Sequence, residues 1–144
     1  MANESVKRLE ENCISAGLTF GTDISNNGNC FFEAVSAQLM RLCLPRKTAT
    51  ELRQQVVEYL SNDRESQSCN GLSNWEVWST EMRMEGVFAD HIAVFGTAQM
   101  LKMDIVIVTS APNSNPRQSV TWIVGDPNFS GNPLLLGYCW ENQY

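Results

Sequence analysis

The sequence predicts an α+β domain, and three features of the chain support this prediction. Between residues 5 and 102, apolar side chains recur at spacings of three and four, which is typical of amphipathic helices. After residue 102, short apolar runs alternate with segments rich in turn-forming residues, which indicates strands. Because the helices come first and the strands gather at the end, we expect helices packed around a small, mostly antiparallel sheet.

Two helices are expected in the N-terminal part of the chain. The first covers residues 5–16, and Gly17 follows it as a C-terminal cap. The apolar positions of this helix are Val6, Leu9, Cys13 and Ile14. After an extended segment, a second helix begins at Cys30. The positions on its apolar face are Phe31, Ala34, Val35, Gln38, Leu39 and Leu42.

Three more helices are expected before the strands. The third helix covers residues 50–60. Ser73 and Glu76 have the spacing of a capping box and open the fourth helix, whereas Asp90 caps the fifth, over residues 91–102. The apolar faces are Leu52, Val56, Tyr59 and Leu60, then Trp75, Trp78 and Met82, then Ile92, Phe95, Ala98 and Gln99 or Leu101. We interpret the tryptophan and methionine stripe of the fourth helix as core packing.

Three strands are expected in the C-terminal part. Residues 103–110 contain the run Ile-Val-Ile-Val and give the clearest strand. Residues 111–118 hold two prolines and two asparagines, so they are expected to form a surface loop. A second strand covers residues 119–124, and a third covers residues 133–140 after a turn.

Length and composition predict one globular domain over residues 1–144. Apolar residues make up 43% of the chain and charged residues 18%. A net charge of −6 without a run rich in lysine or arginine argues against nucleic acid as a partner. The polar start and the short apolar stretches predict neither a signal peptide nor a membrane span. The five cysteines form no C-x-x-C pair, so we expect neither a metal site nor a disulfide framework, and a reduced cytoplasmic setting, with the nucleus as the alternative. No cofactor is expected.

The candidate nucleophile lies where a polar loop meets the second helix. The loop is residues 25–29, Ser-Asn-Asn-Gly-Asn, and Cys30 follows it directly. A thiol at this place feels the positive end of the helix dipole and free backbone N–H groups, which favour the thiolate. Gly28 lets the backbone turn, and the same N–H groups suit an oxyanion on a substrate carbonyl. The alternative is a small buried apolar side chain, the usual role of a cysteine at the start of an apolar helix.

Residues 27–39, N-G-N-C-F-F-E-A-V-S-A-Q-L, resemble the signature D-G-N-C-[LF]-F-x-A-[VI]-[SA]-x-Q-L of the ovarian tumour (OTU) family of cysteine deubiquitinases. Residues 52–60 are similar to the family's L-R-x-x-V-V-x-Y-L, residues 86–92 to its G-x-W-G-D-x-[IL], and residues 133–144 to its closing strand and E-x-H-Y motif. The resemblance implies the OTU-like cysteine protease fold with Cys30 as nucleophile. It also implies hydrolysis of the bond after the C-terminal glycine of ubiquitin or a ubiquitin-like modifier.

Two catalytic positions implied by the resemblance depart from the family pattern. Asn27 stands where the family has an aspartate, and Gln143 stands where it has the histidine that serves as general base. A glutamine side chain cannot accept the thiol proton at neutral pH, nor protonate a leaving amine. The single histidine, His91, begins a mostly apolar helix, and we interpret it as structural or capping. We therefore expect hydrolysis to be lost or strongly impaired.

The sequence leaves three functions open. The first is a thiol hydrolase built on Cys30, which needs a base from elsewhere or a parent sequence with histidine at position 143. The second is an inactive module that keeps a ubiquitin-facing surface, which Asn27 and Gln143 together favour. The third is a scaffold domain without ubiquitin contact. The predicted site is Cys30, Asn27 and Gln143 with Gly28 and Asn29 as the oxyanion loop, in a monomer whose partner is ubiquitin or a ubiquitin-like modifier.

Overall fold

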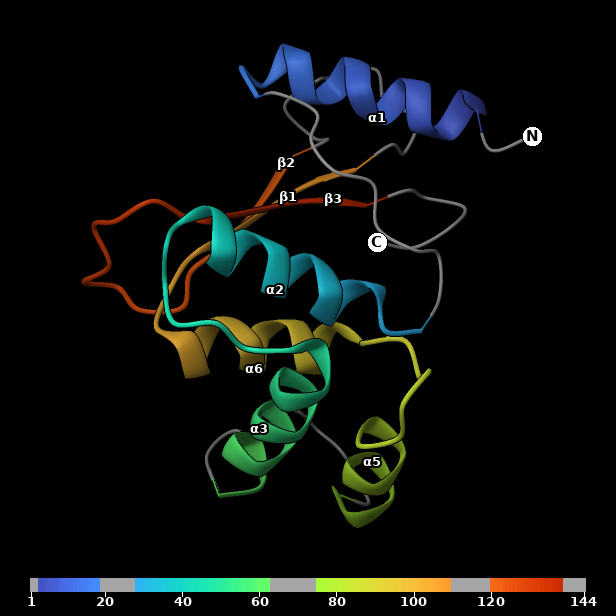
Figure 1. The fold of residues 1–144 in the computed structure, drawn as a ribbon, viewed down its shortest axis with the longest axis vertical. Coiled ribbons are helices and arrows are strands. Elements are labelled where there is room, and N and C mark those ends of the chain that lie inside the picture. Colours follow the sequence, from blue (N-terminus) through green and yellow to red (C-terminus); the bar gives the residue numbers. More distant parts are fainter. Residues whose placement is uncertain (1–2, 19–27, 63–74, 110–119, 139–144) are drawn as a thin grey trace.

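The computed structural model describes residues 3–18, 28–62, 75–109 and 120–138. Its helices are α1 (Asn3–Ser15), α2 (Cys30–Arg41), α3 (Ala49–Asn62), α5 (Trp75–Met82) and α6 (His91–Leu101). Its strands are β1 (Ile105–Thr109), β2 (Val120–Ile123) and β3 (Leu134–Tyr138). The helices precede the strands along the chain and cover the sheet, as Figure 1 shows, so the predicted α+β class is confirmed.

The sheet has the strand order β2-β1-β3 and is mixed. β1 and β2 are antiparallel, with Val106 opposite Trp122, whereas β1 and β3 are parallel, with Val106 opposite Leu135. The parallel pair differs from the mostly antiparallel sheet that the sequence predicts. The reason is that the chain after β2 crosses to the far edge of β1, so that β3 runs in the same direction as β1.

The sheet lies between α1 on one side and the other helices on the opposite side (Figure 1). The face toward α2 and α6 belongs to the larger core, to which the sheet contributes Ile105, Ile107, Ile123, Leu134 and Leu136. On the other face, Val108 packs with Leu9 and Cys13 of α1. In addition, Asn12 Nδ2 donates a hydrogen bond to the Thr109 carbonyl oxygen at 2.7 Å. β1 is therefore buried on both faces and forms the centre of the fold.

Three residues that helical spacing assigns to apolar faces are exposed instead. Ile14, Tyr59 and Phe95 have exposed fractions of 65%, 37% and 51%. α6 shows the reason most clearly, because it is buried round most of its circumference. Its buried residues are Ile92, Ala93, Val94, Gly96, Thr97 and Ala98. A Cβ at Gly96 would lie 2.5 Å from Leu60 Cδ1, so α3 approaches α6 closely at this glycine, and Phe95 is left on the outside.

Other local predictions are confirmed. Gly17 follows α1 with a φ of +77°, as expected of a left-handed C-terminal cap. Trp78 and Met82 are 8% and 4% exposed within the main core, so the stripe of α5 is core packing. Ser73, the expected capping residue of α5, and the side chain of Val6 lie outside the part of the chain that the structure describes.

Candidate active site

Cys30 is the first residue of α2, at the junction that the sequence predicts. Its neighbours Phe31, Phe32 and Val35 are at most 1% exposed, so the N-terminus of α2 is anchored in the core. Cys30 itself is 1% exposed. At this place the helix dipole and the N–H groups of the first turn create a positive potential that favours a thiolate.

Asn29 is the N-cap residue of α2, but its side chain does not cap the helix. An N-cap asparagine usually accepts a hydrogen bond from an N–H group of the first turn. Here Asn29 Oδ1 accepts from Arg53 Nη2 at 2.8 Å and from the Gly86 N–H at 3.0 Å. The side chain therefore ties the loop before α2 to α3 and to the segment between α5 and α6.

Arg53 of α3 is fully buried, with an exposed fraction of 0%. Its Nη2 also donates to Gly28 O at 3.0 Å and to Val87 O at 2.8 Å, and its Nη1 donates to Met82 O at 2.9 Å. The guanidinium carbon lies 4.8 Å from the ring centre of Phe32, a cation–π contact. One side chain thus joins the loop before α2, the end of α5 and the segment that follows α5.

Both Nη atoms of Arg53 donate to oxygen acceptors, whereas its buried Nε has no hydrogen-bond partner within the described residues. Burial lowers the pKa of Arg53 below its ordinary value, and the negative charge of Glu85 opposes this change. A guanidinium nevertheless stays protonated in proteins, so a permanent positive charge lies beside the loop before α2. We refer to this set of residues as the Arg53 clamp: Arg53, Gly28, Asn29, Met82 and Val87.

Gly28, a member of the Arg53 clamp, is in direct backbone contact with Gly86. A Cβ built at Gly28 would lie 1.6 Å from Gly86 O, so the backbone as it stands leaves no room for a side chain at position 28. Gly86 has a φ of +85°, a conformation that other residues rarely adopt. The sequence predicts Gly28 as a turn residue, and the structure adds that its missing side chain lets a second backbone segment reach the loop.

The structure places only part of the predicted site. Gly28, Asn29 and Cys30 lie together at the N-terminus of α2. Asn27 and Gln143 lie outside the described residues, so their predicted roles stay predictions.

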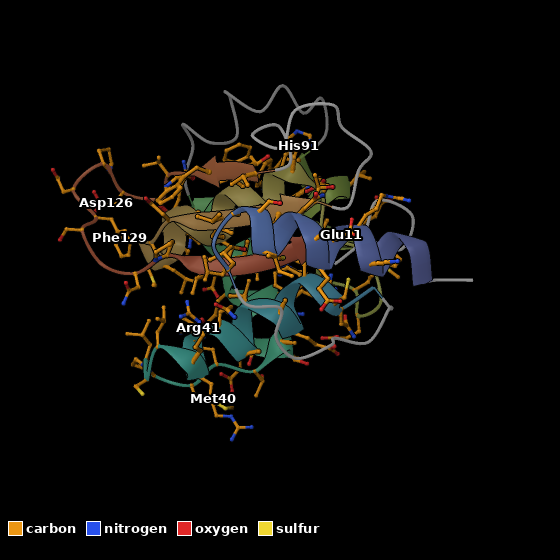
Figure 2. The ribbon with its side chains drawn as sticks, turned by 90° about the horizontal axis from the view of Figure 1, so that it is seen from above. Glu11, Met40, Arg41, His91, Asp126 and Phe129 are labelled. Carbon is orange, nitrogen blue, oxygen red and sulfur yellow. The ribbon has the colours of Figure 1, made fainter. Side chains whose placement is uncertain are left out.

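His91 is the first residue of α6 and its side chain is exposed (Figure 2). The cap of this helix is Asp90, as the sequence predicts. Asp90 Oδ1 accepts from the Ala93 N–H at 2.9 Å, and Oδ2 accepts from Trp78 Nε1 at 2.7 Å. The capping role suggested for His91 therefore belongs to its neighbour.

Two residues that support the site, Arg53 and Gln38, are absent from the site predicted from sequence. Gln38 Oε1 accepts from the Leu135 N–H at 3.0 Å and from Arg41 Nε at 2.8 Å, and Arg41 Nη2 donates to Pro133 O at 3.1 Å. In Figure 2, Arg41 lies at the end of α2 toward the sheet. These bonds fix α2 to the beginning of β3, the strand that leads toward the last residues of the chain.

A sequence signal for Arg53 does exist. It precedes Val56, Val57 and Leu60 by three, four and seven residues, so it occupies the apolar face of its helix. A charged residue at such a position is buried only when it is paired or hydrogen-bonded. An arginine there therefore indicates that partners for its side chain lie in the core. Gln38 has a similar signal, because it is a polar residue on the apolar face of α2.

Cys30 stands at the N-terminus of α2 beside a loop that Arg53 holds, which is the setting that nucleophilic chemistry at a thiol would use. A helix N-terminus and a fixed loop can hold a thiolate and the oxyanion that forms beside it. Within the described ranges, no group of three or more His, Cys, Asp or Glu side chains could hold a metal ion. None of the helices in those ranges has the length and apolar character needed to cross a bilayer.

Comparisons with known proteins identify the family and the fold. A family model described as OTU-like cysteine protease matches residues 25–140. The structure of the OTUD1 OTU domain is similar with a TM-score of 0.70 at 17% identity, over 98% of this chain and 92% of that chain. The crystal structure of the viral OTU domain protease from Dera Ghazi Khan virus is similar with a TM-score of 0.64 at 15% identity, over 85% and 76%. No curated protein matches the chain by sequence.

Proposed function

The chain belongs to the family of OTU-like cysteine proteases, and we propose that residues 1–144 form one such domain with the site of a deubiquitinase. The bond it addresses follows the C-terminal glycine of ubiquitin or of a ubiquitin-like modifier. In the chain as written, hydrolysis is lost or strongly impaired. The observation that carries the proposal is the place of Cys30, the first residue of a helix anchored in the core, directly after a loop that Arg53 holds.

The proposed reaction assigns each residue a role. The Cys30 thiolate attacks the carbonyl carbon of the substrate glycine, and the carbonyl oxygen becomes an oxyanion as the S–C bond forms. N–H groups of the loop that contains Gly28 and Asn29, and of the first turn of α2, stabilise that oxyanion. The C–N bond then breaks, and the leaving amine takes up a proton, which must come from solvent because Gln143 cannot supply it. Water then cleaves the thioester on Cys30, which releases the glycine carboxylate and regenerates the thiol. Asn27 offers the loop a hydrogen bond but no negative charge.

Gln143 is the reason for the proposed loss of activity. The base of a thiol protease takes the thiol proton and later gives it to the leaving amine, and a glutamine amide does neither at neutral pH. Positioned acid–base catalysis contributes about 10²–10⁴-fold, so we expect turnover to fall by about this factor. The N-terminus of α2 still favours the thiolate, which leaves the attack itself less impaired than the departure of the amine.

The test is release of a fluorophore from the C-terminus of ubiquitin by three proteins. These are the chain as written, Gln143→His, and Gln143→His combined with Cys30→Ala. We expect the first to be silent or nearly so, the second to be active, and the third to be silent again. If Gln143→His stays silent while circular dichroism shows an intact fold, the proposal that only the base is missing is wrong.

The second candidate function is a binding module that keeps the ubiquitin-facing surface without hydrolysis. Asn27 and Gln143 favour it, because the loss of two catalytic side chains at once is expected when selection on catalysis has relaxed. A titration of ubiquitin against the Cys30→Ala variant separates the candidates. Saturable binding together with a silent Gln143→His variant supports the binding module, and the absence of both binding and cleavage supports a scaffold domain.

A further inference from the structure

Arg53 has no part in the chemistry proposed above, yet it lies directly behind the nucleophile loop. Replacing this arginine alone by an apolar residue would leave its oxygen acceptors without their donor, so Arg53 contributes to the stability of the fold. The positions of those acceptors point to a further role beside the nucleophile. The hydrogen-bonded acceptors of Arg53 are four oxygens: Met82 O, Val87 O, Gly28 O and Asn29 Oδ1. Two of these belong to the two residues immediately before Cys30.

We propose that Arg53 is a positioning residue that orients the peptide group between Gly28 and Asn29 for oxyanion stabilisation at Cys30. The inference rests on the proposed function and adds to it the side chain that sets the geometry of the loop. It also explains why the side chain of Asn29 does not cap α2: Asn29 Oδ1 is bound to Arg53 and to the Gly86 N–H.

The orientation follows from the planarity of the peptide group. Arg53 Nη2 donates to Gly28 O at 3.0 Å, so this carbonyl points toward the buried guanidinium. No peptide bond in the described residues is cis. In a trans peptide the C=O and the N–H point in opposite directions, so the Asn29 N–H points away from Arg53. By holding the carbonyl, Arg53 thus fixes the direction of a backbone donor one residue before the nucleophile.

The charge of Arg53 has a second effect on the same peptide group. A hydrogen bond from a cation to a carbonyl oxygen is stronger than one between neutral groups, and it polarises the amide. A polarised amide is a better N–H donor toward a developing negative charge. A lysine at position 53 keeps the charge but lacks the planar fork that reaches several acceptors, so it should support the loop only in part.

The first experiment measures kcat and KM for fluorophore release from ubiquitin in the Gln143→His background, with Arg53→Met and Arg53→Lys added separately. Loss of one oxyanion donor costs about 10²–10³-fold in kcat. We expect Arg53→Met to lower kcat by about 100-fold with KM changed less than about threefold, and Arg53→Lys to fall in between. Arg83→Met removes an exposed arginine next to α5 and is the matched control, with kcat unchanged. A folded Arg53→Met variant with kcat within threefold of its parent overturns the proposal.

A second readout does not depend on ubiquitin hydrolysis and uses the chain as written. Alkylation of Cys30 by iodoacetamide is followed against pH by mass spectrometry, with the exposed Cys43 as an internal reference. Loss of the fixed peptide and of the buried charge should raise the pH midpoint of Cys30 alkylation by about one unit, whereas that of Cys43 stays constant. An unchanged midpoint for Cys30 contradicts the proposal even when Gln143→His is inactive.

Urea titration of each variant serves as the control that the variant is folded. If Arg53→Met fails to fold, Arg53→Lys carries the test, because it keeps the charge and at least one hydrogen bond. A folded Arg53→Lys variant with unchanged kcat and an unchanged Cys30 midpoint then overturns the proposal. If Gln143→His is silent but the midpoint shifts as expected, the proposed function fails and the positioning role of Arg53 stands.

Discussion

Substitution of Gly28 by alanine is expected to destabilise the fold through a clash between two backbone segments. The new Cβ would lie 1.6 Å from Gly86 O and 2.1 Å from the carbonyl carbon of the same residue. A Cβ and a carbonyl oxygen approach no closer than about 3.0 Å, so the segments must move apart by about 1.4 Å. Both partners are backbone, so no side-chain rotation relieves the contact. The Gly86 N–H bond to Asn29 Oδ1, 3.0 Å long, would be broken by this movement.

The cost of Gly28→Ala can be worked out from these contacts. Overpacking costs about 1–3 kcal/mol. The lost hydrogen bond between the Gly86 N–H and Asn29 Oδ1 adds about 0.5–1.5 kcal/mol. We therefore expect the free energy of unfolding to fall by about 1.5–4.5 kcal/mol.

Gly86→Ala is the matched control on the other side of the contact. A Cβ there has no atom within 4 Å, and its cost comes from the positive φ of +85°. That conformation costs about 1–2 kcal/mol for a residue other than glycine. Equilibrium urea unfolding followed by circular dichroism measures both variants. A Gly28→Ala variant that loses less than about 1 kcal/mol, or less than Gly86→Ala, would refute the assignment of a backbone contact at Gly28.

Two further substitutions test the supports of the site. Asp90→Ala removes the cap of α6 and the acceptor of Trp78 Nε1, so it should lower the free energy of unfolding by about 2–3 kcal/mol. Asp90→Asn should cost about half as much. Equal losses for the two variants in urea titrations would contradict this prediction. Gln38→Ala removes the acceptor of the Leu135 N–H, so hydrogen exchange at Leu135 should accelerate at least about tenfold while exchange in α3 changes little. Unchanged exchange at Leu135 would show that Gln38 does not hold β3.

Apolar periodicity was sufficient to predict most of the helices and strands and most of their buried positions, but not every residue that faces the core. The spacing of Phe95 fits an apolar face of α6, yet the helix packs so closely on α3 at Gly96 that small residues occupy the buried sides. Which neighbour a helix meets is a tertiary property, so a single helix cannot reveal it. The order β2-β1-β3 is likewise set by a crossover between strands, and the strand sequences do not encode it.

The part of the site that depends on neighbouring residues in the sequence could be predicted, whereas the part that depends on tertiary contacts could not. The step from a polar loop to an apolar helix is written in the residues around Cys30, and the structure confirms that α2 begins there. Burial of Arg53 depends on carbonyl oxygens of Met82 and Val87 that lie far away in sequence. These acceptors come together only in the fold, so the sequence shows an arginine on an apolar face but not its partners.

The most direct test of the central claim, that the site retains its nucleophile and lacks its acid–base group, compares two leaving groups. We would measure hydrolysis of two kinds of substrate, a ubiquitin C-terminal thioester and isopeptide-linked diubiquitin, the latter in each of its lysine linkages. Both substrates are tested with the chain as written and with Gln143→His. A thiolate leaves without a proton, whereas a lysine amine with a pKa of about 10.4 needs one. We expect Gln143→His to accelerate isopeptide cleavage at least about tenfold more than thioester cleavage, with both lost in Cys30→Ala. Equal acceleration of both substrates, or none of either, would contradict the claim.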